Sequence, residues 1–300
     1  MASSSAASET QMIRRLGPKP ATAARSTFEP LALPPRPGTK AVAQLRWDLH
    51  LFMRGDEGIE SQAALARRVE VLVDMYQVLH SLNEDLALVG GRSAARLVAT
   101  LEAFTNELQA EPGDASSSAV RTFAQGIDLL AHLLEREPVG LEEGGPAPFV
   151  LVVDDEPLSR RLANLSLERA GLARISLDSS SEAIEILQRQ NFDLVLLDMH
   201  LPEMDGCELC CRLRKMSGHA NTPVVFVTGR HDLKARAMAS ISGGTDFIGK
   251  PFHGGELAVK ALCHILRARS PRPLGDTAIF TLGEMMPRGA AGTTVLSPGV

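Results

Sequence analysis

Five polar residues are candidates for shared chemistry, because each stands where a predicted strand ends. They are Asp154, Asp155, Asp198, Thr228 and Lys250. Carboxylates that are brought together raise each other's pKa unless a cation lies between them. Carboxylate oxygens suit Mg²⁺, which keeps several of its waters and shares its coordination with phosphoryl groups. A lysine ammonium and a threonine hydroxyl can neutralise and hydrogen-bond the remaining oxygens. The set predicts a carboxylate that accepts a phosphoryl group beside a magnesium ion.

The segments that precede these residues indicate strands of a parallel sheet. They occupy residues 149–153, 192–197, 223–227 and 246–249. Helix-length segments alternate with them, at residues 157–170, 180–190, 206–216, 231–242 and 254–268. Apolar runs that alternate with amphipathic helices are typical of an open, doubly wound sheet covered on both faces. Because the carboxyl ends of the strands converge at one edge of such a sheet, we expect the five residues to meet there.

Four blocks of this region resemble the receiver domain of two-component response regulators. They are VVDDEP at 152–157, DMHLPEMDG at 198–206, VTG at 227–229 and KPF at 250–252. The resemblance spans residues 149–268 and implies a flavodoxin-like (βα)5 fold. It also implies that Asp198 takes a phosphoryl group from a phosphohistidine or from a small phosphodonor.

The resemblance further assigns the ligands of the magnesium ion. It implies that Asp155 binds Mg²⁺ directly, that Asp154 reaches the ion through a water, and that Asp198 shares the site. The backbone carbonyl of His200 would complete the coordination. A simpler interpretation of the acid pair stays open, because acidic residues often cap a helix whose first residue is a proline, here Pro157.

Four more residues near the predicted site acquire roles through the resemblance. Thr228 matches a switch hydroxyl, Lys250 a lysine that pairs with the phosphoryl group, and Phe247 an aromatic side chain that changes rotamer. Pro251 matches a proline that follows a cis peptide bond. If Thr228 moves toward a phosphoryl group, Phe247 can fill the space that it leaves. A local change of charge would then become a change of packing.

Residues 41–137 are predicted to form an antiparallel helical bundle, because apolar residues recur there at helical spacing. Three stripes carry the pattern: Leu65, Val69, Leu72, Val73, Tyr76 and Leu79; Leu97, Leu101, Phe104 and Leu108; and Val120, Phe123, Ile127, Leu130 and Leu134.

The bundle resembles a histidine phosphotransfer domain around His80. The matching positions are His80, Leu82, Val89, Gly90, Leu101 and Glu102. Asn83 and Glu84 stand where that family has lysine and glycine. Glu84 shares a helix face with His80 and would repel an incoming phosphoryl group. Two interpretations stay open: a degenerate bundle with a surface histidine, or a bundle whose histidine exchanges phosphate.

Composition indicates the nature of the remaining segments and the class of partner that the chain can bind. Residues 1–40 hold six of the eighteen prolines and are predicted to form a disordered arm. Residues 138–148 are predicted to be a linker, and residues 269–300 a disordered tail. Residues 41–147 carry eight Lys and Arg against seventeen acidic residues, so no nucleic-acid surface is expected. No apolar run reaches the roughly 18 residues of a membrane span. With only four cysteines, we expect a cytoplasmic protein.

The expected function is that of a response regulator without a DNA-binding output domain. A sensor histidine kinase or a phosphotransfer protein would phosphorylate Asp198. The signal would leave as changed protein–protein contacts, through a surface over 231–268 that binds another protein or a second copy. The alternative is a phosphorelay intermediate that passes phosphate between Asp198 and a histidine of the bundle. In either case the chain is not expected to be an enzyme, beyond assisting its own phosphorylation and dephosphorylation.

Overall fold

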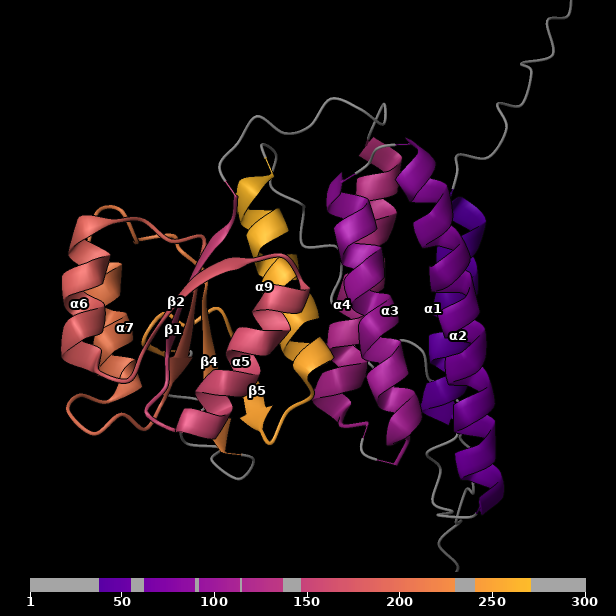
Figure 1. The fold of residues 1–300 in the computed structure, drawn as a ribbon, viewed down its shortest axis with the longest axis horizontal. Coiled ribbons are helices and arrows are strands. Elements are labelled where there is room, and N and C mark those ends of the chain that lie inside the picture. The colour runs from indigo at the N-terminus through magenta and orange to yellow at the C-terminus, as the bar shows by residue number, and fades with distance from the viewer. Residues whose placement is uncertain are drawn as a thin grey trace, which may run out of the picture. The chain divides into compact units, whose positions relative to one another are not determined.

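A five-stranded parallel sheet with the order β2-β1-β3-β4-β5 forms the centre of the second half of the chain (Figure 1). The computed structural model describes residues 38–54, 62–89, 92–113, 115–136, 147–229 and 241–270. The strands are β1 (Phe149–Val153), β2 (Ala173–Leu177), β3 (Leu194–Asp198), β4 (Val224–Gly229) and β5 (Asp246–Lys250). β3 lies in the middle and is buried along its whole length, as its apolar sequence predicts.

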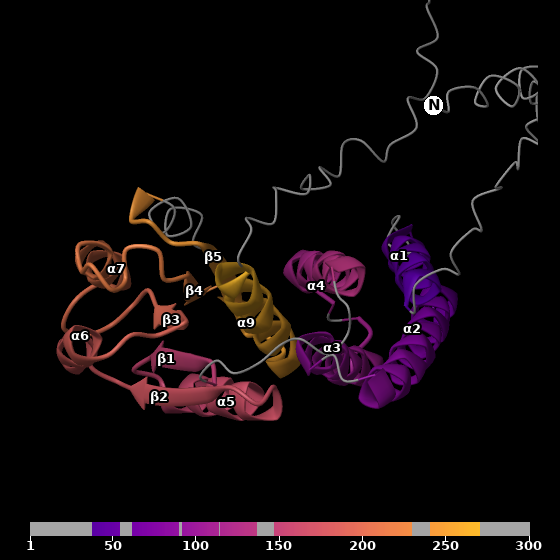
Figure 2. The same ribbon diagram turned by 90° about the horizontal axis from the view of Figure 1, so that it is seen from above.

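Helices cover both faces of this sheet. They are α5 (Pro157–Arg169), α6 (Ser180–Arg189), α7 (Gly206–Arg214) and α9 (Gly254–Arg269). α6 and α7 pack on one face and α5 and α9 on the other (Figure 2). The predicted doubly wound sheet is therefore confirmed. The helix expected over 231–242 lies almost wholly outside the described residues, as do most of the expected arm, linker and tail.

Strand β2 has no continuous apolar run, so the pattern of apolar residues does not predict it. Its sequence, ARISL, places Arg174 and Ser176 between apolar residues, and its burial is only partial until Leu177. It pairs with β1 alone and so lies at the edge of the sheet. An edge strand needs no continuous apolar run, because water reaches one side of it.

Four helices precede the sheet: α1 (Thr39–Arg54), α2 (Gln62–Val89), α3 (Arg92–Ala110) and α4 (Ser117–Arg136). The predicted helical bundle is present, but the predicted stripe of α2 is wrong at two positions. Leu65 and Val73 are 43% and 38% exposed. The buried side of α2 is formed by Val71, Leu72, Met75, Leu79, Leu82 and Leu86. Within the described ranges, no helix combines the length and hydropathy needed to cross a bilayer.

The core of the bundle continues into the sheet through α9. Every described residue belongs to one compact unit. A single cluster of buried apolar side chains runs from α1–α4 through α9 and α5 to one face of the sheet. Most of α9 is buried: Gly255, Glu256, Leu257, Ala258, Val259, Lys260, Ala261, Leu262, Cys263 and Ile265. A helix that is apolar on nearly all sides needs cover on nearly all sides.

This arrangement corrects one prediction about partners. The surface expected over 231–268 includes α9, but α3 and α4 of the same chain already pack against that helix. Gly126 of α4 lies so close to it that an added Cβ would be 3.2 Å from Val259. The α9 part of the predicted surface is therefore wrong as a docking site for another protein.

Candidate functional site

Three carboxylates meet at the carboxyl edge of the sheet, as the strand topology predicts. Asp154 and Asp155 follow β1, and Asp198 ends the neighbouring strand β3. One oxygen of each side chain lies within 4.8 Å of those of the other two. Asp154 and Asp198 are buried whereas Asp155 is exposed. Three hard oxygen donors at this spacing, with one side open, fit the chemistry of a divalent cation such as Mg²⁺.

Lys250 brings a positive charge into the acidic cluster from the end of β5. Its Nζ lies 2.6 Å from Oδ2 of Asp198 and 3.0 Å from Oδ2 of Asp154. A third carboxylate oxygen, Oε2 of Glu156, lies 3.4 Å away. No pattern in the sequence assigns a role to Glu156, although it directly follows the acid pair. Lys250 thus balances part of the negative charge that would otherwise oppose clustering of these side chains.

The site perturbs the protonation of both Asp198 and Lys250. Burial raises the pKa of Asp198, although the hydrogen bonds from Lys250 and from the His200 amide act in the opposite direction. Burial alone would lower the pKa of Lys250, but its hydrogen bonds to Asp198 and Asp154 and their charges raise it overall. The lysine is therefore held as a cation beside a carboxylate that is costly to ionise without a positive partner.

Hydrogen bonds fix the two buried carboxylates from their own loops. Oδ1 of Asp154 accepts from the Glu156 amide at 2.9 Å, and Oδ2 accepts from the Ser159 hydroxyl at 2.5 Å. Oδ1 of Asp198 accepts from the His200 amide at 3.1 Å. The alternative interpretation of the acid pair as a helix cap fits Asp154 only in part. The amide that Asp154 binds belongs to Glu156, the residue before α5, and not to the first turn of the helix.

Thr228 lies near Asp198 on the neighbouring strand. In the pairing of β3 with β4, Asp198 stands opposite Val227, one residue before Thr228. Thr228 is completely buried, and its Oγ1 has no hydrogen-bond partner within the described part of the chain. A buried hydroxyl that lacks a partner is uncommon in proteins.

The other two predicted positions lie on β5 and directly after it. Phe247 is half-buried and packs against the core on the α6–α7 face. The Lys250–Pro251 peptide is cis, which confirms the prediction.

Gly206 lets α7 begin directly beside the phosphoacceptor candidate. An added Cβ at Gly206 would lie 2.2 Å from the carbonyl oxygen of Asp198 and 3.0 Å from Cα of Met199. The side chain of Asp205 caps the helix by accepting from the Cys207 amide at 2.7 Å. The loop after Asp198 can therefore turn tightly only because residue 206 has no side chain.

His80 forms a second polar group, on α2 of the bundle. Its ring is about half-exposed, its Nδ1 lies 2.8 Å from Oε1 of Glu102 on α3, and its Nε2 lies 3.8 Å from Oε1 of Glu84. Tyr76 stacks on the ring with 5.8 Å between centroids. The hydrogen bond to Glu102 and the charge of that carboxylate raise the pKa of His80. Asn83 also binds Glu102.

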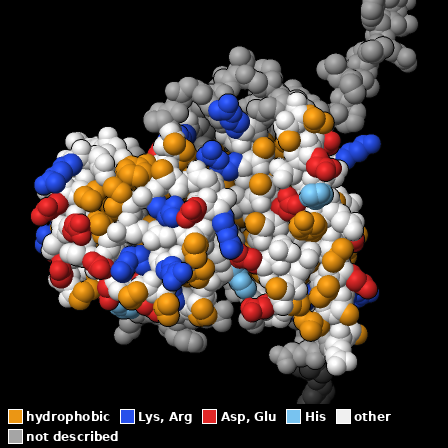
Figure 3. Space-filling model, viewed as in Figure 1, with side chains coloured by type: hydrophobic (Ala, Val, Ile, Leu, Met, Phe, Trp, Pro, Cys, Tyr) orange, Lys and Arg blue, Asp and Glu red, His pale blue; other side chains and the backbone are white. Residues whose placement is uncertain are grey.

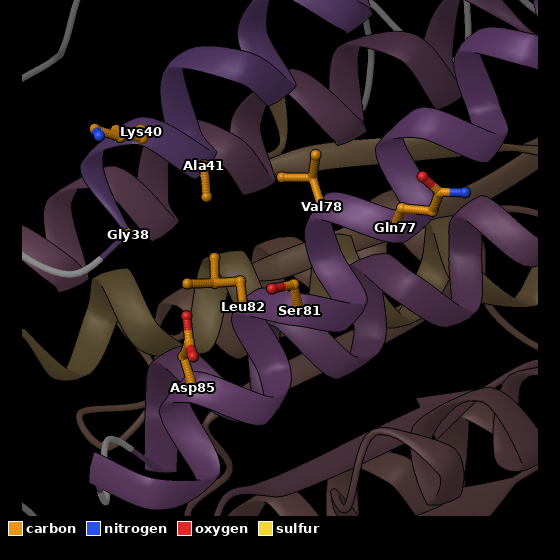
Figure 4. A pocket seen from close by; sticks show the side chains of 8 residues that line it. All are labelled: Gly38, Lys40, Ala41, Gln77, Val78, Ser81, Leu82 and Asp85. Carbon is orange, nitrogen blue, oxygen red and sulfur yellow. The ribbon is translucent and has the colours of Figure 1, made fainter.

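A hollow of about 400 Å³ lies elsewhere, between the start of α1 and the C-terminal half of α2. Figure 4 shows its lining residues, Gly38, Lys40, Ala41, Gln77, Val78, Ser81, Leu82 and Asp85. It contains neither the acidic cluster nor His80. The hollow is therefore separate from the residues that could carry out chemistry. We place the functional site at the acidic cluster, at the edge of the sheet.

Comparison with protein families agrees with the geometry at this edge. Residues 150–262 match the family model of the response regulator receiver domain. This segment is a receiver domain. Its acidic pocket of Asp154, Asp155 and Asp198 is typical of the magnesium site in receiver domains. The matched range does not extend over helices α1–α4.

The receiver domain has relatives among characterised proteins and solved structures. It is 34% identical over 121 residues to the transcriptional regulatory protein SrrA of Staphylococcus aureus, in an alignment that covers 40% of this chain and 49% of SrrA. The chain thus spans about half the length of the curated relatives it matches. A putative response regulator from Chloroflexus aurantiacus is 27% identical, with a TM-score of 0.40 over 41% of this chain and 100% of its own. The Vibrio cholerae chemotaxis response regulator CheY4 is also 27% identical, with a TM-score of 0.38 over 40% and 99%.

Proposed function

We propose that this protein is a two-component response regulator that is phosphorylated on Asp198. The observation that carries the proposal is the position of Lys250, whose Nζ joins Asp198 to Asp154 across the ends of β3 and β1. A lysine that satisfies two buried carboxylates can transfer its hydrogen bonds to the oxygens of a phosphoryl group on one of them. The hydroxyl of Thr228, buried and without a partner in the described residues, supports the same use of the site.

The proposed reaction is transfer of a phosphoryl group from a phosphohistidine. A carboxylate oxygen of Asp198 forms a bond to phosphorus while the phosphorus–nitrogen bond breaks. The departing electron pair stays on the imidazole nitrogen, which then takes a proton. Lys250 and Thr228 hydrogen-bond the phosphoryl oxygens. Asp154, Asp155, Asp198 and the His200 carbonyl would hold a magnesium ion, which neutralises negative charge when bound.

The donor would be a histidine kinase or a phosphotransfer protein, and α5 offers it a docking surface. Leu158, Leu162 and Leu165 recur at helical spacing on α5 and are 77%, 38% and 45% exposed. The helix begins two residues after Asp155, so this stripe starts beside the acidic cluster. Figure 3 shows hydrophobic side chains next to basic ones on the face of the molecule that carries α5. An apolar stripe beside a reactive group suits a partner that must present its histidine there.

The test is labelling of the full chain by acetyl phosphate in the presence of Mg²⁺. We expect Asp198→Asn to abolish the label, because an amide cannot act as the nucleophile. Asp178→Asn is the matched control, since Asp178 directly follows the neighbouring strand β2 but its side chain is exposed and pairs with Arg160. It should label like the wild type. Full labelling of Asp198→Asn would contradict the assignment.

A phosphorelay role is the second candidate, and the contacts of His80 favour it. Because Glu102 accepts from Nδ1, the neutral ring keeps its lone pair on the outward Nε2, as a nucleophile requires. Glu84 near that nitrogen acts against an incoming phosphoryl group. In a chain labelled on Asp198, relay predicts an alkali-stable phosphohistidine that His80→Gln removes. A label that stays entirely on the aspartate would exclude relay.

A further inference from the structure

The bundle contacts the segment that connects β5 to α9, which begins directly after Lys250. Phe252 packs against the shared core. The ring of His253 lies 6.3 Å from the ring of Phe104 on α3, measured between centroids. Gly255 lies against the backbone of Phe104, so closely that an added Cβ would be 2.6 Å from its Cα. Phe252, His253 and Gly255 thus pack against the shared core, the last two of them against Phe104 of α3.

Glu107 of α3 caps the amino terminus of α9. Its Oε2 accepts from the Gly255 amide at 2.7 Å. The residue at the N-cap position of α9 is His253, whose side chain makes no capping hydrogen bond. The amides of a helix's first turn have no partners within the helix, and a carboxylate there is also stabilised by the helix dipole. The bundle therefore supplies the cap that the local sequence of α9 lacks.

The remaining contacts of Glu107 and α9 show that the cap is part of a continuous interface. Oε1 of Glu107 lies 3.6 Å from a guanidinium nitrogen of Arg169, at the end of α5. One residue after Gly255, the buried carboxylate of Glu256 accepts from the Ser118 hydroxyl of α4 at 2.6 Å. Any shift of α3 relative to α9 must therefore disturb the start of α9, and with it the short connection to Lys250.

We propose that Glu107 is a positioning residue for the phosphorylation site. By capping α9 it holds the connection from which Lys250 reaches Asp198, so that the helical bundle sets the reactivity of the receiver domain. The inference rests on the proposed function, because it concerns the same Lys250 and Asp198. It also gives the bundle a role that requires no phosphate on His80.

The test compares three variants of the full chain, Glu107→Ala, Glu107→Gln and Arg169→Ala. For each, we would measure the rate of labelling by acetyl phosphate, the affinity for beryllofluoride with saturating Mg²⁺, and the affinity for Mg²⁺ alone. Glu107→Ala should slow labelling and weaken beryllofluoride binding by up to about fivefold, the factor that corresponds to losing the whole stabilisation of a helix cap. Its Mg²⁺ affinity should not fall, because the carboxylates lie at the ends of β1 and β3 and a less firmly held Lys250 repels the ion less.

The other two variants separate positioning from general stability. Glu107→Gln keeps an oxygen that accepts from Gly255 and should retain most of the wild-type rate. Arg169→Ala removes the ion pair but not the cap and should behave as wild type. The proposal is overturned if Glu107→Ala labels and binds beryllofluoride as the wild type does while its Gly255 amide loses protection from hydrogen exchange. Equal losses in Glu107→Ala and Arg169→Ala would also overturn it. A wild-type chain that takes no label refutes the proposed function itself.

Discussion

Replacing Gly255 by alanine tests whether α3 and α9 pack as closely as described. The new Cβ would lie 2.6 Å from both Cα and Cβ of Phe104, and 2.8 Å from Cδ2 of its ring. Contacts below 3.0 Å force a displacement. Phe104 cannot yield easily, because one of the contacts is with its backbone and its side chain is completely buried. The two helices must therefore separate or the start of α9 must move.

The size of the effect follows from two opposing contributions. Overpacking of this kind costs about 1–3 kcal/mol of stability, whereas alanine in place of glycine within a helix gains about 0.5–1 kcal/mol. From the middle of each range, the net expectation is a loss of about 1.3 kcal/mol in the free energy of unfolding. With a urea m-value of about 3 kcal/mol/M, the midpoint of unfolding should fall by roughly 0.5 M.

Two other glycines of the bundle provide matched controls in urea titrations followed by circular dichroism. Gly113 lies between α3 and α4 with open space around its Cα, so Gly113→Ala should change stability by less than about 0.5 kcal/mol. An added Cβ at Gly126 would meet only side-chain ends of Leu101 and Val259, at 2.8 and 3.2 Å. Gly126→Ala should therefore fall between the other two. Equal midpoints for Gly255→Ala and Gly113→Ala would refute the close packing of α3 on α9.

Two further predictions concern the acidic cluster. Mg²⁺ at about 100 times its dissociation constant should raise the free energy of unfolding by about 2.7 kcal/mol, as measured by calorimetry. Asp155→Ala should remove most of that gain. An undiminished gain in the variant would refute Asp155 as a ligand. Because burial raises the pKa of Asp198 in the folded chain, the folded state binds its proton more tightly than the unfolded state. In the absence of metal, stability should fall as pH rises from the ordinary carboxyl pKa through this raised value. Asp198→Asn should remove that part of the pH dependence in urea titrations, and an unchanged dependence would show that Asp198 does not cause it.

The acidic cluster could be predicted from sequence because topology alone brings strand ends together. Asp154, Asp198 and Lys250 each end a strand of one parallel sheet, and such ends meet at one edge whatever the loops contain. Glu156 is different, because whether its carboxylate turns toward Lys250 depends on the conformation of an exposed side chain. Its distance of 3.4 Å from Lys250 could not be derived from its place beside the acid pair.

The role of Glu107 could not be predicted for a related reason. It is 148 positions from Gly255, and no local pattern joins a glutamate near the end of one helix to the amide of another. The phase of α2 also depended on its neighbours. Leu65 and Val73 fit a helical stripe as well as Leu72 and Leu79 do, but α1 and α3 pack on the side that includes Met75 and Leu82. Helical spacing indicates that a helix has an apolar side, whereas the packing of neighbouring helices decides which apolar residues on that side are buried.

The shared core around α9 has a consequence for where the chain can be divided. The receiver family match ends at residue 262, in the middle of α9, whereas the helix itself continues to Arg269. Helix α9 is at once the last helix of the receiver domain and an inner helix of the bundle. A fragment that begins at β1 would expose Val259 and the apolar residues around it to water, and exposed patches of this kind promote aggregation. Because α3 and α4 pack against α9, a fragment that keeps this helix covered must include both of them. The segment that matches the receiver family is therefore smaller than the part of the chain that shares one hydrophobic core.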